Sequence, residues 1–194
     1  MDDKVVALLV GRMNRTHHFI EATVSELSQE DLCLRPASTA PPIGWHIWHI
    51  TRWADWFQAS FPAQTQVWET QQLSLSLGLD DMALGPMQTG MTMSHDDAAQ
   101  IPIIIGKERL IDYMKNVFAL NKTVLGDLTL DNLYQPRESF AKWDYVDGKV
   151  IRAKGKDVTL VDDIGYHLTH ANRHLGMIEG LIGAVLDKSG TASI

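Results

Sequence analysis

Apolar residues recur with helical spacing in four segments of the chain, which predicts four amphipathic helices. The first segment covers residues 3–28, which no proline interrupts. Its apolar positions share one helix face: Val6, Leu9, Met13, Ile20, Val24 and Leu27. The last segment opens near Asp162 and Asp163, acidic residues suited to a helix N-terminus, and ends near Lys188 and Gly190.

Prolines bound the second predicted helix. It begins after Pro41 and Pro42, a natural start signal, and ends before Pro62. Residues 62–93 follow as a long connection, in which we expect one short helical turn around Trp68. A loop of this length in a compact domain usually has a function or covers another part of the structure.

The third predicted helix follows Ser94, whose spacing to an acidic residue three positions on is a capping pattern. It runs to Gly126, and we expect Pro102 to kink or restart it. Between the third and fourth helices, residues 137–158 contain an Asp147-Gly148 pair flanked by β-prone residues. Such a pair predicts a small β-hairpin before the last helix.

One phrase of eleven residues occurs twice. Residues 43–53 read IGWHIWHITRW and residues 164–174, 121 positions later, read IGYHLTHANRH. Upstream of each copy stands a Leu-Ser or Leu-Thr N-cap with a short acidic turn and a proline, ELSQEDLCLRP at 26–36 and DLTLDNLYQP at 127–136. The sequence therefore predicts an all-α bundle with a pseudo-twofold internal repeat, in which the second and fourth helices are equivalent.

Composition limits the classes of function. We treat residues 1–194 as a single domain, because this length with 45% hydrophobic residues supplies one well-buried core. Seventeen basic and 24 acidic side chains leave a net charge of −7, which argues against nucleic acid and anionic membranes as partners. The single cysteine, Cys33, forms no internal disulfide, and no apolar run approaches the roughly 18 to 20 residues of a membrane span. We expect a cytoplasmic protein.

Histidines dominate the repeated phrase. His170 and His174 are four residues apart, so on a helix their side chains are neighbours and can converge on one metal ion. If the second helix packs beside the fourth, the repeat places His49 at the position equivalent to His170, facing the pseudo-twofold axis. Three imidazoles on one side of an ion leave the other positions to water or substrate, as in a catalytic site. Imidazole suits zinc, nickel, iron or copper, and the sequence does not choose among them.

A structural interpretation of the histidines stands beside this one. Two histidines four apart occur often by chance, and we read His46 and His167 as histidines behind the ligands, as alternative ligands or as core residues. His17, His18 and His95 are expected to be solvated or locally hydrogen-bonded. The tryptophans of the second helix are expected mainly to pack in the core.

PPIGWHIWHITRWADWF in the second helix together with HLTHANRHLGMIEGLIG in the fourth resembles the DinB/YfiT-like family of metalloenzymes, in its branch with a Trp-x-x-x-His lead. The resemblance covers essentially the whole chain. It implies a four-helix bundle with one long crossover, and a divalent metal, such as zinc, nickel or iron, held by His49, His170 and His174. It also implies a metal-dependent thiol transferase, with a low-molecular-weight thiol as cosubstrate, or a hydrolase.

The reaction stays open at this point. An open three-histidine site lowers the pKa of water bound to zinc to about 7 and would act on a small-molecule substrate. Tyr166 and Asp55 are weak candidates for proton handling, because the sequence lacks the glutamate beside the histidine pair that metalloproteases use. The alternative is a non-catalytic bundle that binds metal or forms a homodimer through its first and third helices.

Overall fold

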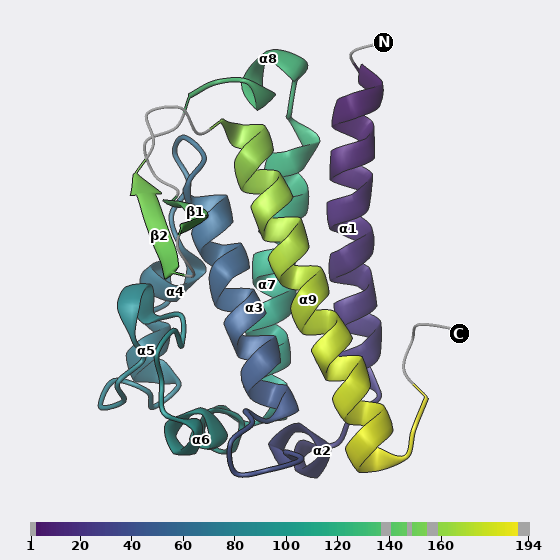
Figure 1. Cartoon of the computed structure of the whole chain (residues 1–194), viewed down its shortest axis with the longest axis vertical. Coiled ribbons are helices and arrows are strands. Elements are labelled where there is room, and N and C mark those ends of the chain that lie inside the picture. Colours follow the sequence, from purple (N-terminus) through teal and green to yellow (C-terminus); the bar gives the residue numbers. More distant parts are fainter. Residues whose placement is uncertain (1–2, 137–140, 147–148, 155–158, 190–194) are drawn as a thin grey trace.

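The computed structural model describes residues 3–136, 141–146, 149–154 and 159–189. Four long helices form a bundle: α1 (Asp3–Ser25), α3 (Ile43–Ala59), α7 (Lys107–Gly126) and α9 (Leu160–Leu186) (Figure 1). Both α1 and α3 pack against α7 and α9, and α3 and α9 pack face to face. The predicted all-α bundle is confirmed, and the pseudo-twofold relation between its halves stays an interpretation of the repeat.

A short capped helix follows the first long helix of each half. α2 (Gln29–Cys33) begins at Ser28, whose hydroxyl accepts from the Asp31 amide while the Asp31 side chain accepts from the Ser28 amide. α8 (Leu130–Leu133) begins at Thr129 with the same reciprocal bonds to Asn132. These capping boxes satisfy amides that a helix start would otherwise leave unpaired.

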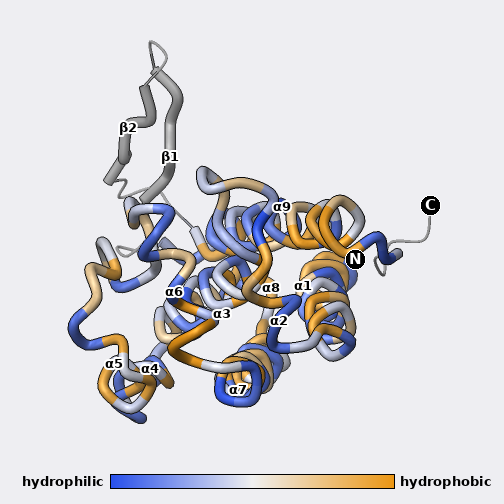
Figure 2. Tube along the Cα trace, turned by 90° about the horizontal axis from the view of Figure 1, so that it is seen from below, coloured by the Kyte–Doolittle hydropathy of each residue, from blue (hydrophilic) through white to orange (hydrophobic). Residues whose placement is uncertain are grey.

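The long crossover runs from α3 to α7 on the side of the bundle away from α1 (Figures 1 and 2). It contains α4 (Val67–Thr70), α5 (Leu73–Ser76), a 3-10 turn (Pro86–Gln88) and α6 (His95–Ile105). α4 is the helical turn expected around Trp68. The expected interruption of the third helix falls at Gly106, with φ of 76°, and Pro102 lies inside α6.

Two strands precede α9. β1 (Ala141–Val146) and β2 (Lys149–Lys154) pair antiparallel, with Val146 opposite Lys149. The expected turn at residues 147 and 148 lies outside the described residues, so the hairpin as a unit stays a prediction. In the described part of the chain, no helix has both the length and the apolar character of a membrane span.

Apolar and polar positions alternate along the bundle helices (Figure 2), and the apolar ones form the core. α3 is buried along almost its whole length, because α7, α9 and the crossover helix α6 all pack against it. At its start, Gly44 lies so close to α6 that an added Cβ would stand 2.5 Å from the Cβ of Pro102. α9, by contrast, keeps one face exposed.

Candidate metal centre

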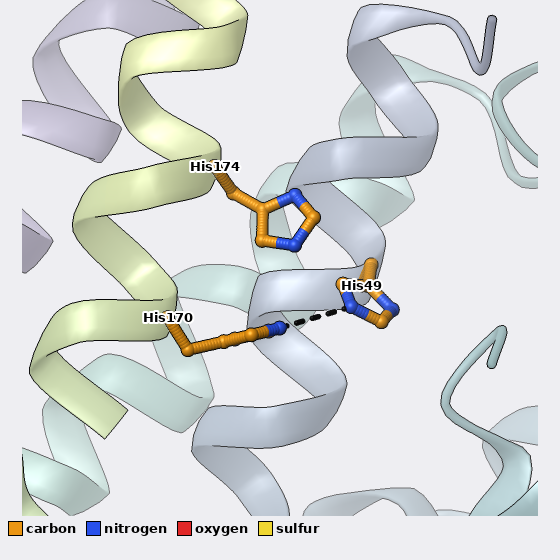
Figure 3. Close-up of side chains that lie close together, drawn as sticks. All are labelled: His49, His170 and His174. Atoms are coloured by element: carbon orange, nitrogen blue, oxygen red, sulfur yellow. Dashed lines mark hydrogen bonds between the residues drawn. The ribbon is translucent and has the colours of Figure 1, made fainter. Parts of the chain in front are cut away.

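Three of the histidines selected from the sequence meet between α3 and α9. Figure 3 shows His170 and His174 extending from α9 toward His49 on α3. The Nε2 atoms of His49 and His170 are 3.2 Å apart, and one ring nitrogen from each of the three histidines lies within 4.8 Å of the other two. The three therefore form a group that can hold a metal ion.

The separation of the first two nitrogens fits a shared ion. Two imidazole nitrogens bound at about 2.0 to 2.1 Å in tetrahedral geometry stand about 3.3 to 3.4 Å apart. The observed 3.2 Å between His49 and His170 is close to that value, and a nitrogen of His174 lies within 4.8 Å of both. The donor set, three imidazoles without a carboxylate or thiolate, suits a divalent transition metal such as zinc, nickel or iron.

Groups behind two of the rings determine which nitrogen faces the centre. The Nδ1 of His49 bonds to the backbone carbonyl of Thr89, which can only accept, so Nδ1 carries the proton and Nε2 is free to coordinate. The Nδ1 of His174 lies 2.8 Å from the Nδ1 of His46. A proton on Nδ1 of His174, donated to His46, would likewise leave its Nε2 free.

Aromatic rings enclose the three histidines. Trp45 stacks on His49, with ring centres 4.5 Å apart and planes 13° from parallel. Trp53 meets His170 edge-on at 5.5 Å, and Tyr166, one turn earlier on α9, stacks on His170 at 6.1 Å. Two of the tryptophans therefore border the centre as well as the core, and Trp48 is fully buried.

Burial keeps these imidazoles neutral. It lowers the pKa of His49 to about 3, of His46 and His170 to about 4, and of His174 to about 2. The neighbouring imidazoles lower the pKa of His49 and His174 further. Neutral imidazole is the form that binds metal, so near pH 7 binding displaces no proton from these rings.

His167 lies one turn before His170 on α9 but does not belong to the group of three. Its ring stacks on Phe57 at 5.0 Å and meets His17 edge-on at 5.8 Å. His17 in turn stacks on Phe118, and burial lowers its pKa to about 3. Of the two expectations for His17, solvation is therefore wrong, because α7 and α9 cover that turn of α1. His18 and His95 are exposed as expected.

Asp55, one of the two candidates for proton handling, belongs to a buried network in which both carboxylate oxygens are occupied. It forms an ion pair with Arg52 at 3.2 Å, and both side chains are at most 1% exposed. The other donors to its carboxylate are the amides of Val67 and Trp68, the Gln58 amide group and the Tyr113 hydroxyl. Tyr166, the second candidate, is half-buried beside His170.

Sequence reasoning missed Thr89, whose carbonyl bonds to His49, and also Arg52 and Gly90, which contact neighbouring parts of the crossover and α3. The position of Arg52 within the repeated phrase was a signal that could have been used, because a charged residue inside an apolar helix needs partners. Thr89 contributes only its backbone carbonyl, which leaves no trace in residue type. Gly90 lies where an added Cβ would stand 2.7 Å from the Trp48 ring and 3.1 Å from that of Trp45.

The fold agrees with the comparisons with known proteins. A family model described as the DinB superfamily matches residues 12–178, and the chain belongs to this superfamily. A solved structure, a conserved protein from Enterococcus faecalis, superposes with a TM-score of 0.74 at 20% identity over 97% of this chain and 99% of that chain. This likeness shows a shared fold. No curated protein matches the chain.

Proposed function

We propose that the protein is a divalent-metal-dependent enzyme acting on a small molecule, with His49, His170 and His174 as the metal ligands. The observation that carries the proposal is the approach of the His49 and His170 Nε2 atoms to 3.2 Å from two different helices. Among the described residues, no other group of histidine, cysteine or acidic side chains has this arrangement. When bound, the ion supplies Lewis-acid chemistry and lowers the pKa of a coordinated water or thiol.

The charge of the centre favours an anionic reactant. Three neutral imidazoles leave both positive charges of a divalent ion uncompensated. Arg173, between the two ligands on α9, adds a positive charge, which contributes to the lowered pKa of His170 and His174. A thiolate would partly neutralise this field, which supports S-transfer from a low-molecular-weight thiol; hydrolysis uses the same feature with water as the source of the anion.

Other residues near the centre take separate roles in this proposal. His46 holds the Nδ1 of His174, and Trp45 and Trp53 exclude water beside the ligands. Tyr166 handles protons at the edge of the site, since its ring stacks on a ligand and its side chain is half-buried. We do not assign this role to Asp55, whose carboxylate is occupied by Arg52 and its other donors.

Metal binding by protein purified without a histidine tag tests the proposal. The metal-free protein should bind one zinc, nickel or iron ion per chain in calorimetry, and His49→Ala or His170→Ala should weaken binding at least 100-fold. His95→Ala is the matched control, because it removes an exposed histidine at the start of α6. Weak binding that is equal in all three variants would instead support the non-catalytic bundle.

Activity separates the two types of reaction. The metal-loaded protein should be assayed on electrophilic substrates with and without added low-molecular-weight thiols, and on esters and amides without thiol. A rate that depends on both metal and thiol supports S-transfer, whereas a thiol-independent rate supports hydrolysis. Turnover that persists unchanged after metal removal would contradict the proposal.

A further inference from the structure

The ring of His49 is oriented by a carbonyl group that belongs to the crossover, 40 residues further along the chain. We propose that Arg52 is a positioning residue for the metal centre, which holds residues 87–89 in place so that the Thr89 carbonyl sets the ring orientation and the protonated nitrogen of His49. The inference rests on the proposed function for its effect on metal binding, although the orientation itself is a property of the metal-free protein.

Arg52 contacts the two peptide groups that precede Thr89. Its Nε donates to the Gln88 carbonyl at 2.8 Å, and its Nη2 donates to the Met87 carbonyl at 3.1 Å. Arg52 and His49 lie three residues apart on α3, on neighbouring positions of one helix face. One turn of α3 therefore contacts three successive carbonyls of the crossover, two through arginine and one through histidine.

The guanidinium is itself fixed from the opposite side. Its Nη1 donates to Asp55 at 3.2 Å and to the Tyr113 hydroxyl at 3.0 Å, and its Nη2 also donates to Gln66 at 2.9 Å. The ring of Trp68 lies 4.3 Å from the guanidinium carbon. With every nitrogen engaged and the plane covered by an indole ring, Arg52 has one orientation available and presents a rigid pair of donors to the crossover.

Met87 and Gln88 need such support because their backbone conformations are unfavourable for side chains larger than glycine. Met87 and Gln88 have φ values of 57° and 52°, in the left-handed region. The Trp56 indole also donates to the Met87 carbonyl, at 3.2 Å, and Gly90 approaches the ring of Trp45. The contacts around Arg52 offset the backbone strain and keep the Thr89 carbonyl beneath His49.

The consequence for the centre is a fixed tautomer. With its proton on Nδ1 and bonded to Thr89, His49 turns the lone pair of Nε2 toward His170. If residues 87–89 moved away from His49, the proton could shift to Nε2 and the ring could rotate. Both changes would have to be reversed before His49 could bind a metal ion. Groups behind metal ligands typically change affinity about 10- to 100-fold.

The test compares two variants of the same buried network. Tyr113→Phe removes one hydroxyl from the network but keeps the ion pair and the contacts of Arg52 to the crossover, and it serves as the control. Arg52→Gln combined with Asp55→Asn removes those contacts without leaving an unpaired buried charge, which favours folding of the variant. Ring nitrogen NMR on the metal-free proteins reports the tautomer of His49, and zinc competition reports affinity.

We expect the wild type and Tyr113→Phe to keep the proton of His49 on Nδ1, and the double variant to populate both tautomers and bind zinc about 10-fold more weakly. A folded double variant with the tautomer and the zinc affinity of Tyr113→Phe would overturn the inference. The two proposals fail separately: a wild type that binds no metal contradicts the proposed function, whereas the tautomer comparison still decides the role of Arg52. Arg52→Lys provides a second folded variant with the same expected direction.

Discussion

The two copies of the repeated phrase keep the same register but have different neighbours. His49 and His170 occupy equivalent positions and face each other across the interface of α3 and α9. Arg52 and Arg173 are equivalent too, yet the first is 1% exposed with a full set of partners and the second is exposed. The repeat directs the ligands inward on both helices, while the crossover, which covers α3 alone, gives the remaining side chains different roles.

The other equivalent pair of histidines shows the same divergence. His46 bonds to the ring of His174, so it lies directly behind a ligand of the centre. His167 stacks on Phe57 and contacts His17, so it packs in the core between α1, α3 and α9. The role of each histidine in this pair thus depends on which helix its side chain faces. Each pair of equivalent residues therefore offers two variants that can be compared directly.

The largest expected difference is between the two arginines. Arg52→Ala leaves the Asp55 carboxylate buried without its cation, and we expect the free energy of unfolding to fall by about 3 to 5 kcal/mol. Arg173→Ala changes an exposed side chain and should stay within about 0.5 kcal/mol of wild type. Urea unfolding of both variants measures this, and equal losses would show that burial does not distinguish the copies.

The two inner histidines should differ in their effect on metal. His46→Ala removes the group behind His174, so we expect metal affinity to fall about 10- to 100-fold. His167→Ala opens a space beside Phe57 and should reduce stability while changing metal affinity less than about threefold. Calorimetric titration of the folded variants decides between them. A comparable loss of affinity in both variants would place His167 in the centre as well.

The glycines at the second position of each copy give a smaller contrast of opposite sign. In Gly44→Ala the new methyl group would stand 2.5 Å from Pro102, and we expect a loss of about 1 to 3 kcal/mol. Around Gly165 no described atom lies within 4 Å of an added Cβ, so Gly165→Ala should gain about 0.5 to 1 kcal/mol from helix propensity. Thermal unfolding reports both. A Gly44→Ala variant more stable than the wild type would mean that α6 moves aside at little cost in free energy.

The pH dependence of stability should reveal the contribution of the buried His17. Burial lowers the pKa of His17 from 6.5 to about 3, so below pH 6.5 the unfolded chain binds a proton that the folded chain does not. The free energy of unfolding therefore falls as the pH falls from 6.5 toward 3. His17→Phe should reduce this slope by about 1.4 kcal/mol per pH unit below pH 6. Urea unfolding of the wild type and of His17→Phe at pH 5 and pH 7 measures this. An equal change in the free energy of unfolding between the two pH values in both proteins would contradict the prediction.

Local sequence patterns predicted much of the fold and of the metal centre. The helix of residues 43–59 follows from its prolines and apolar spacing, and the spacing of His170 and His174, with the repeat, pointed to His49. Their common approach depends only on two helices packing face to face. The remaining features depend on contacts between distant segments: the burial of His17 requires α7, and the Thr89 carbonyl reaches His49 only through the path of the crossover.

The wide separation of the three histidines along the chain has a consequence for biosynthesis. His49 precedes His170 by 121 residues, and Thr89 lies between them, so a nascent chain that lacks its last helix holds one of the three nitrogens. Tight loading with metal must then await the completed protein. An ion bound by the three histidines would form a reversible cross-link between the early and late parts of the polypeptide. Its release would accompany unfolding.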